Sequence, residues 1–193
     1  MSKLQLTKTT MYHYEESARL LRARAGVGPY EPFDSLALAS QLGVVLKYPD
    51  EVDNLPEDLL AEMNRLDAKE WSGMGHELPT GKLFVVLNRN QTPERARVTL
   101  LEEVAHQYHG HTPVGVGPSG RAQYHPEEEQ EAKFTAAAAL LPSKEVAKAV
   151  YRGDSVAHLA SKYGASIELV EMRIKTLNLW EHLQQRELAE VAA

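Results

Sequence analysis

The stretch RARVTLLEEVAHQYHGH, residues 95–111, limits what this chain can fold into more than any other part of it. Thr92 can cap a helix, Pro93 suits the first helical position, and Gly110 offers a stop. Apolar residues recur between them at helical spacing: Val98, Leu101, Ala105 and Tyr108. The sequence therefore predicts a helix with one buried face.

This helix carries two carboxylates and an imidazole, those of Glu102, Glu103 and His106. Glu102 and His106 are four residues apart, so they lie on one face, one turn above the other. The pattern E-E-x-x-H differs from the zinc-peptidase pattern H-E-x-x-H only at its first position. In that pattern the histidines hold the metal and the glutamate takes a proton from water. His106 is thus a candidate ligand, Glu103 a candidate base, and Glu102 the candidate for the other ligand.

A third metal ligand is expected from a later helix. The segment that starts at Pro126 is acidic at first, continues through a run of alanines and ends before Pro142. Glu131 is its natural candidate ligand, with Glu128 and Glu127 one turn earlier on a similar face. The alternative for the glutamate pair of the central helix is a solvated surface beside a histidine at the edge of the core.

Two other histidine-containing segments compete for the metal role. The segment HELP at 76–79 begins like H-E-x-x-H, but it ends in proline and has no second histidine. His109 and His111 could join His106 in a cluster. Their place around the helix stop predicts loop residues instead.

The composition is that of a globular protein of 193 residues, long enough for one sizeable domain with a helical appendage. The formal net charge of −6 argues against a nucleic-acid surface spread over the whole molecule. Because the chain has no cysteine, a metal must be held by His, Asp, Glu or backbone oxygen. No signal-peptide core or run of transmembrane length is present, so a cytoplasmic protein is expected.

The remaining segments before residue 142 are predicted from their periodicity. Helices are expected at 14–25 and 32–42, and strands at 44–48, 71–74 and 83–87. The last of these strands, Leu83–Leu87, is apolar throughout and is expected to be buried.

The chain is wholly helical in character after Pro142. The pieces 155–163 and 166–176 are joined through Gly164, with small and apolar residues where a helix-turn-helix needs them. DNA binding is one interpretation, and a helical hairpin packed on the core is the other. From Ser143 onward seven basic residues face seven acidic ones, which favours the hairpin.

The order of these motifs carries a family resemblance. A strand ending in VVLN, PxRxR and TLLEEVAH in the central helix, GH at its end, and the later EQEAKF and LLP resemble the ImmA/IrrE family of zincin-like metallopeptidases. The resemblance covers about residues 18–142, and residues 155–179 resemble the helical extension of one branch. It implies a zincin-like domain at 1–142 and a helical, helix-turn-helix-like extension at 143–193.

The resemblance implies an α+β fold in which a small mixed sheet lies beside an H-E-x-x-H-type helix and a Glu-bearing helix. Residue by residue, it places the second histidine ligand at His106, the general base at Glu103 and the carboxylate ligand at Glu131. The first histidine ligand falls on Glu102, where this sequence departs from the family. Members typically cut a helix-turn-helix transcriptional repressor, which releases genes of stress response or mobile elements.

The resemblance also implies how a substrate would be held. The strand Leu83–Leu87 would be the sheet edge along which an extended substrate pairs. Tyr124 and His125, just before the Glu-bearing helix, would reach the tetrahedral intermediate, and ordinary loop surface is the alternative for both.

The glutamate at position 102 changes the charge of the predicted metal site. Two histidines and one glutamate leave a Zn²⁺ site positive, whereas two glutamates and one histidine leave it neutral. A less positive site acidifies water less and suits harder cations such as Mn²⁺ or Mg²⁺. The expected outcomes are a peptidase with an altered metal, a weakly active zinc enzyme, or a metal-free relative that regulates a protein partner by binding.

Overall fold

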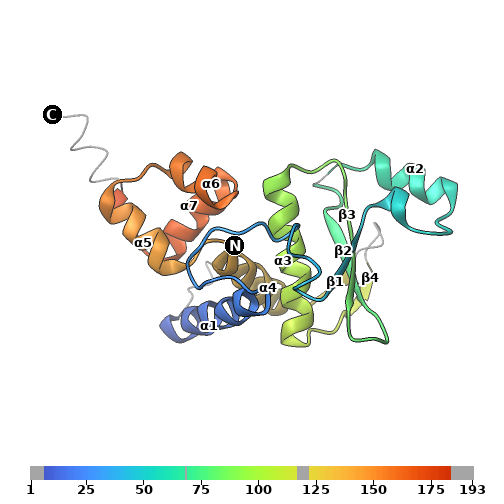
Figure 1. The fold of residues 1–193 in the computed structure, drawn as a ribbon, viewed down its shortest axis with the longest axis horizontal. Helices are drawn as coiled ribbons and strands as arrows, with labels where there is room; N and C mark the ends of the chain where they lie inside the picture. The colour runs from blue at the N-terminus through green and yellow to red at the C-terminus, as the bar shows by residue number, and fades with distance from the viewer. Residues whose placement is uncertain (1–6, 68, 117–121, 184–193) are drawn as a thin grey trace.

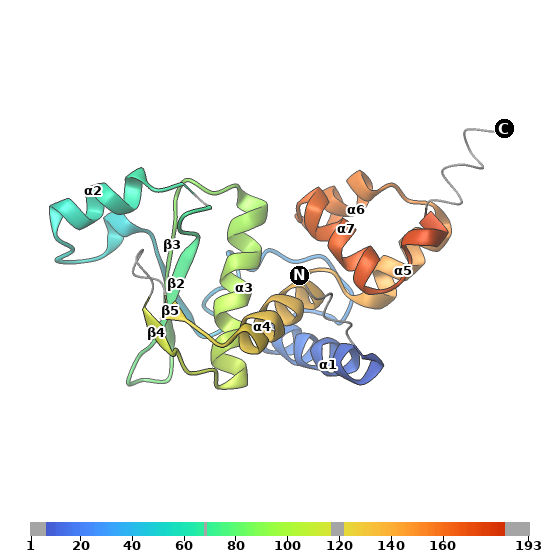
Figure 2. The ribbon, with the colours of Figure 1, turned by 180° about the vertical axis from the view of Figure 1, so that it is seen from behind.

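The computed structural model describes residues 7–67, 69–116 and 122–183 and has an α+β fold (Figure 1). In both views α3 stands between the sheet on one side and α4, α1 and the C-terminal helices on the other (Figures 1 and 2). The elements follow in the order α1 Lys8–Arg24, β1 Val44–Lys47, the 3₁₀ helix η1 Pro49–Glu51, α2 Glu57–Arg65, β2 Gly73–Glu77, β3 Leu83–Leu87, α3 Pro93–His109, β4 Gly115–Val116, β5 Ala122–Gln123, α4 Pro126–Leu140, α5 Ser143–Arg152, α6 Val156–Tyr163 and α7 Ile167–Thr176. The predicted fold class is confirmed.

The three-stranded sheet has β3 in the middle, parallel to β1 and antiparallel to β2. The expectation that Leu83–Leu87 forms the sheet edge is therefore wrong. A strand that is apolar at successive positions is suited to a place between two neighbours, and Leu83, Val85, Val86 and Leu87 are all buried. The strand β2 forms one edge of the sheet and carries two glycines, Met74, His76 and Glu77.

The central helix α3 begins and ends where its sequence signals predict. The Thr92 hydroxyl accepts a hydrogen bond from the Arg95 amide, and Gly110 ends the helix with φ of 69°. Its burial is wider than the single face expected, because the sheet covers one side and α4 the other. Leu100 and Val104 are fully buried.

Helix α4 packs closely on α3 through alanines, as its composition predicts. Ala136–Ala139 are buried, and such small side chains let two helix backbones approach. Helix α1 lies along α4, where the Tyr14 and Phe134 rings stack with centroids 5.7 Å apart. These contacts bring α1 next to the Glu-bearing helix.

Residues 35–43 form consecutive turns, so the short helix expected at 32–42 is wrong. The Asp34 carboxylate accepts a hydrogen bond from the Leu36 amide at 2.9 Å, a local side-chain contact that competes with helical bonding. Arg97 of α3 donates to the other carboxylate oxygen of Asp34 at 3.1 Å and so fixes the turns against the central helix.

The C-terminal helices pack on the rest of the protein, which confirms the expected hairpin on the core. Ser155 and Ser166 cap α6 and α7, and Gly164 makes the turn between them with φ of 58°. Arg173 of α7 donates to the Leu141 carbonyl at 3.1 Å and pairs with a glutamate of α1. One hydrophobic cluster includes residues from both sides of position 142, and the predicted domain boundary there stays a prediction.

Candidate active site

The three site residues of α3 are buried. Glu102, Glu103 and His106 are 8%, 5% and 3% exposed, so the alternative of a solvated glutamate pair is wrong. Burying a carboxylate is costly unless it is paired or hydrogen-bonded, so two adjacent buried glutamates indicate a built polar site.

A cavity of about 220 Å³ lies between α3 and the edge strand β2. We call it the β2 cavity. Its lining includes Gly75, His76 and Glu77 of β2, together with Glu103, His106 and Tyr124. The Tyr124 ring stacks on the His106 ring with centroids 3.8 Å apart, so Tyr124 belongs to the site rather than to loop surface. His125 is exposed and caps α4 with its backbone, as its amide donates to Glu128 at 3.1 Å.

Glycine at two positions of β2 permits the close approach of this strand to α3. A Cβ on Gly75 would lie 2.7 Å from Oε2 of Glu103, closer than real Cβ contacts come. A Cβ on Gly73 would lie 2.9 Å from the Thr99 methyl group. The carboxylate of Glu103 thus lies directly against the backbone of the edge strand.

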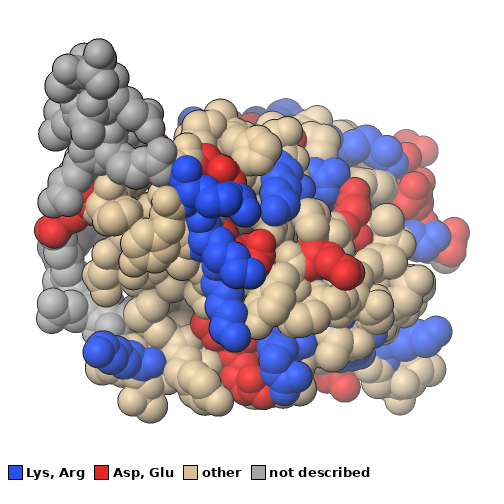
Figure 3. All heavy atoms as spheres, turned by 60° about the vertical axis from the view of Figure 1, so that its left-hand side comes forward, with Lys and Arg blue, Asp and Glu red and all other residues tan. Residues whose placement is uncertain are grey.

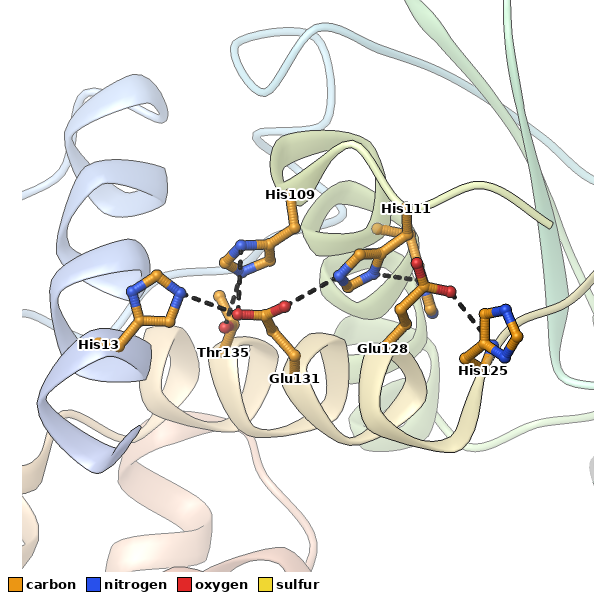
Figure 4. Close-up of polar contacts among 8 residues, drawn as sticks. His13, His109, His111, His125, Glu128, Glu131 and Thr135 are labelled. Atoms are coloured by element: carbon orange, nitrogen blue, oxygen red, sulfur yellow. Dashed lines mark hydrogen bonds and ion pairs between the residues drawn. The ribbon is translucent and has the colours of Figure 1, made fainter. Parts of the chain in front are cut away.

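Glu131 of α4 is the centre of a second polar group, which we call the Glu131 cluster: Glu131, His13, His109 and His111 (Figure 4). Nε2 of His13 lies 2.8 Å from Oε1 of Glu131, and Nδ1 of His109 lies 3.6 Å from the same oxygen. Nε2 of His111 lies 3.0 Å from Oε2. The carboxylate therefore turns one oxygen toward α1 and the other toward His111.

His111 also connects the Glu131 cluster to the β2 cavity, which it helps to line. Its Nδ1 lies 3.0 Å from Nδ1 of His106, so one ring donates a hydrogen bond to the other. The expectation of loop residues is wrong for His109, which is the last residue of α3, and is confirmed for His111, which follows the helix. Both side chains are nonetheless buried, at 7% and 5% exposed. The left-handed Gly110 turn brings His111 back beside the helix.

The charges in the Glu131 cluster shift the pKa values of its members. Burial lowers the pKa of His109 below its ordinary value, against the opposing attraction of Glu131. Burial alone would raise the pKa of Glu131, but the hydrogen bond from His111 and the charge of His109 hold that pKa below its ordinary value. The carboxylate is therefore ionised at neutral pH.

The comparisons with known proteins bear on this geometry. Residues 57–175 match the family described as the IrrE N-terminal-like domain, a family of M78 peptidases. The chain belongs to this family. A Mycobacterium tuberculosis transcriptional regulator of known structure is similar over 82% of this chain and 45% of that one, with 15% identity and a TM-score of 0.49. The chain thus spans less than half the length of that protein. No curated protein matches the chain.

An M78 peptidase implies a metal, typically zinc, and the donors present fit one. Imidazole nitrogens and carboxylate oxygens are common zinc ligands and also suit manganese. Within the described ranges, the group whose ligand atoms all lie within 4.8 Å of one another is His13, His109 and Glu131. It shares Glu131 with the predicted ligand set. Coordination by Glu102, His106 and Glu131 together stays a prediction.

His13 is the site residue that the sequence did not reveal. It lies 118 residues before Glu131, on α1, which the sequence did not connect with the predicted site. Only the packing of α1 along α4 brings it to the site.

None of the helices in the described ranges is long and apolar enough to cross a membrane.

Proposed function

We propose that the protein is a metal-dependent, cytoplasmic endopeptidase that regulates a protein partner, a helix-turn-helix transcriptional repressor, by cutting it. Its family already makes it metallopeptidase-like. The observation that carries the proposal is the shared cavity: Glu103 and His106 are buried in α3 and both line the space beside β2. A base and a candidate metal ligand thus meet where a substrate can enter.

The edge strand β2 supports a peptide substrate. In the three-stranded sheet that the described residues form, β2 pairs on one side with β3 and its other side is the sheet edge. An extended segment can add to such an edge through main-chain hydrogen bonds. Because Gly75, His76 and Glu77 line the β2 cavity, that segment would pass directly over Glu103.

Glu103 has the position of the proton acceptor. It would take a proton from the attacking water and return it to the leaving amine, a role that contributes about 10²–10⁴-fold to a rate. Tyr124 holds the ring plane of His106 by stacking on it. Glu102, His106 and Glu131 would hold the metal, which supplies positive charge that polarises the scissile carbonyl when it is bound.

A second candidate is a regulator that binds the partner through the same cavity without cutting it. It is favoured by the glutamate at 102, in the place of the family's first histidine, and by the contacts of Glu131 with His13 and His111. DNA binding through residues 155–176 is the least favoured. Basic and acidic side chains are interspersed on the face that Figure 3 presents, and Arg173 of α7 is buried against Glu15.

The test is partner cleavage by the wild type and by Glu103→Gln, each loaded with Zn²⁺ or Mn²⁺. The substrate is a purified helix-turn-helix repressor that binds the chain. We expect Glu103→Gln to cut the repressor about 10²–10⁴-fold more slowly and to bind it unchanged. Glu94→Gln, on the first turn of the same helix, is the matched control. Binding without cleavage by the wild type under both ions would replace the proposal with the second candidate.

A further inference from the structure

We propose that His13, His109 and Glu131 form a divalent-metal site between α1, α3 and α4, which shares Glu131 with the predicted ligand set but uses two histidines in place of Glu102 and His106. The site stands on its own geometry and does not rest on the proposed function. Its ligands are Nε2 of His13, Nδ1 of His109 and Oε1 of Glu131. Two imidazoles and one carboxylate around a divalent ion leave a site with a net positive charge. The predicted set lacks this charge, because Glu102 replaces a histidine in it.

The ligand atoms already lie near the separations that a metal needs. Oε1 of Glu131 is 2.8 Å from Nε2 of His13 and 3.6 Å from Nδ1 of His109. One ligand atom from each of the three residues lies within 4.8 Å of the other two. Ligands of a tetrahedral Zn²⁺ are about 3.4 Å apart. Small movements of these side chains would therefore bring the three ligand atoms to the separations of a bound Zn²⁺. The side chains of His13, His109 and Glu131 point toward one another in Figure 4.

His109 is oriented as a metal-ligating histidine is. Its Nε2 lies 3.1 Å from the hydroxyl oxygen of Thr135, which is fully buried on α4. When Nε2 donates to that hydroxyl, the proton is fixed there and Nδ1 keeps its lone pair toward Glu131. A second partner that fixes the tautomer and ring plane is the usual support of a ligand histidine.

Glu131 is supported from its other oxygen. Nε2 of His111 lies 3.0 Å from Oε2, so Oε1 is the oxygen turned toward the proposed ion. His111 in turn contacts His106 at 3.0 Å. One carboxylate thus stands between the proposed ion on the α1 side and the β2 cavity on the other.

The proposed site has an entry path and room for water. An open groove of about 460 Å³ is lined by residues of α1 and α4, among them His13, Glu127, Glu128 and Glu131. The His13 side chain is 57% exposed, so an ion reaches it directly from solvent. The acidic residues of the groove attract a cation, and the nitrogen-rich ligands favour Zn²⁺ over Mg²⁺ or Ca²⁺.

The test is Zn²⁺ binding by the full chain after metal removal, followed by calorimetric titration and by elemental analysis. We expect His13→Ala and His109→Ala to lower the affinity for one equivalent of Zn²⁺ by more than about 100-fold. Loss of a direct ligand should cost more than loss of a residue that only supports a ligand, which costs up to about 100-fold. Thr135→Val should weaken it by about 10–100-fold. His158→Ala removes an exposed histidine on α6 and should leave it unchanged.

The result for His13→Ala decides, because this exposed side chain can be removed without opening the core. Unchanged Zn²⁺ binding in His13→Ala, or no binding in the wild type, would overturn the proposal. Loss in Glu102→Ala and His106→Ala but not in His13→Ala would overturn it too and assign the ion to the predicted set. Partner cleavage is a separate readout, so failure of this site and failure of the proposed function are told apart.

Discussion

The β2 cavity and the Glu131 cluster both depend on α3, but they are built in different ways. Glu103 and His106 come from one helix and line a cavity formed where α3 packs against β2, and the missing side chain of Gly75 leaves room for the Glu103 carboxylate. The Glu131 cluster takes side chains from α1, α4 and the end of α3 and is held by polar contacts. The first region is therefore sensitive to added volume, and the second to lost donors and acceptors.

The difference also separates their expected roles. A buried carboxylate beside a sheet edge suits proton transfer to a bound peptide. A cluster of imidazoles around one carboxylate, open to solvent at His13, suits capture of a cation. His111 connects the two regions, because its ring contacts both His106 and Glu131.

The largest expected effect of a single methyl group is at Gly75. Gly75→Ala places a Cβ 2.7 Å from Oε2 of Glu103, so the carboxylate must move, and cleavage of the partner should fall about 100-fold. Rate measurements with the purified repressor check this. At Gly115 a Cβ meets its nearest neighbour at an ordinary 3.7 Å, so Gly115→Ala is the control. Undiminished cleavage by Gly75→Ala would show that the reaction does not need the Glu103 carboxylate in its present position against β2.

Metal should stabilise the chain through the Glu131 cluster. Zn²⁺ at about 100 times its dissociation constant should raise the free energy of unfolding by about 2.7 kcal/mol, because only the folded state holds the ligands together. Urea unfolding with and without Zn²⁺ measures this. Zn²⁺ should raise the free energy of unfolding of His158→Ala as much as that of the wild type, and that of His13→Ala only slightly. An equal gain in His13→Ala would separate the stabilisation from the cluster.

Removal of the connecting imidazole should destabilise the fold without metal. His111→Ala takes one partner each from His106 and Glu131, both held at 3.0 Å, and should lower the free energy of unfolding by about 1–3 kcal/mol. Denaturant unfolding of the metal-free protein measures it. His76→Ala, at an exposed position of β2, should change stability by under about 0.5 kcal/mol. Equal effects would mean that His111 contributes nothing as a connector.

The smallest expected effect is that of Thr92→Ala, which should influence the β2 cavity and the Glu131 cluster equally. Thr92→Ala removes the cap of α3 and should cost about 1 kcal/mol of stability, with Thr80→Ala in an exposed turn as the control. Because both regions depend on α3 as a whole, Zn²⁺ affinity and partner cleavage should be unchanged at temperatures where the chain is folded. A change in only one of them would show that the helix start serves that region alone.

What the sequence predicted well is local. The limits of α3 follow from Thr92, Pro93 and Gly110, and the shared face of Glu102 and His106 follows from their spacing. The run of alanines in α4 predicted its close packing against a neighbouring element, which is α3. Each of these depends on residues within a few turns of one another.

What the sequence could not predict depends on contacts between distant segments. His13 joins Glu131 only because α1 packs along α4. The edge position of β2 follows from strand order, which no single strand encodes. His109 and His111 looked like loop residues because a helix stop says where a backbone turns, not where the flanking side chains point.

The most direct measurement of the central claim, that Glu131 is the metal-binding carboxylate of the site, is anomalous diffraction at the zinc edge from crystals grown with Zn²⁺. We expect a zinc peak within bonding distance of Glu131, between His13 and His109. A zinc peak at another place in the protein, or no zinc peak near Glu131 in crystals grown with Zn²⁺, would contradict this claim.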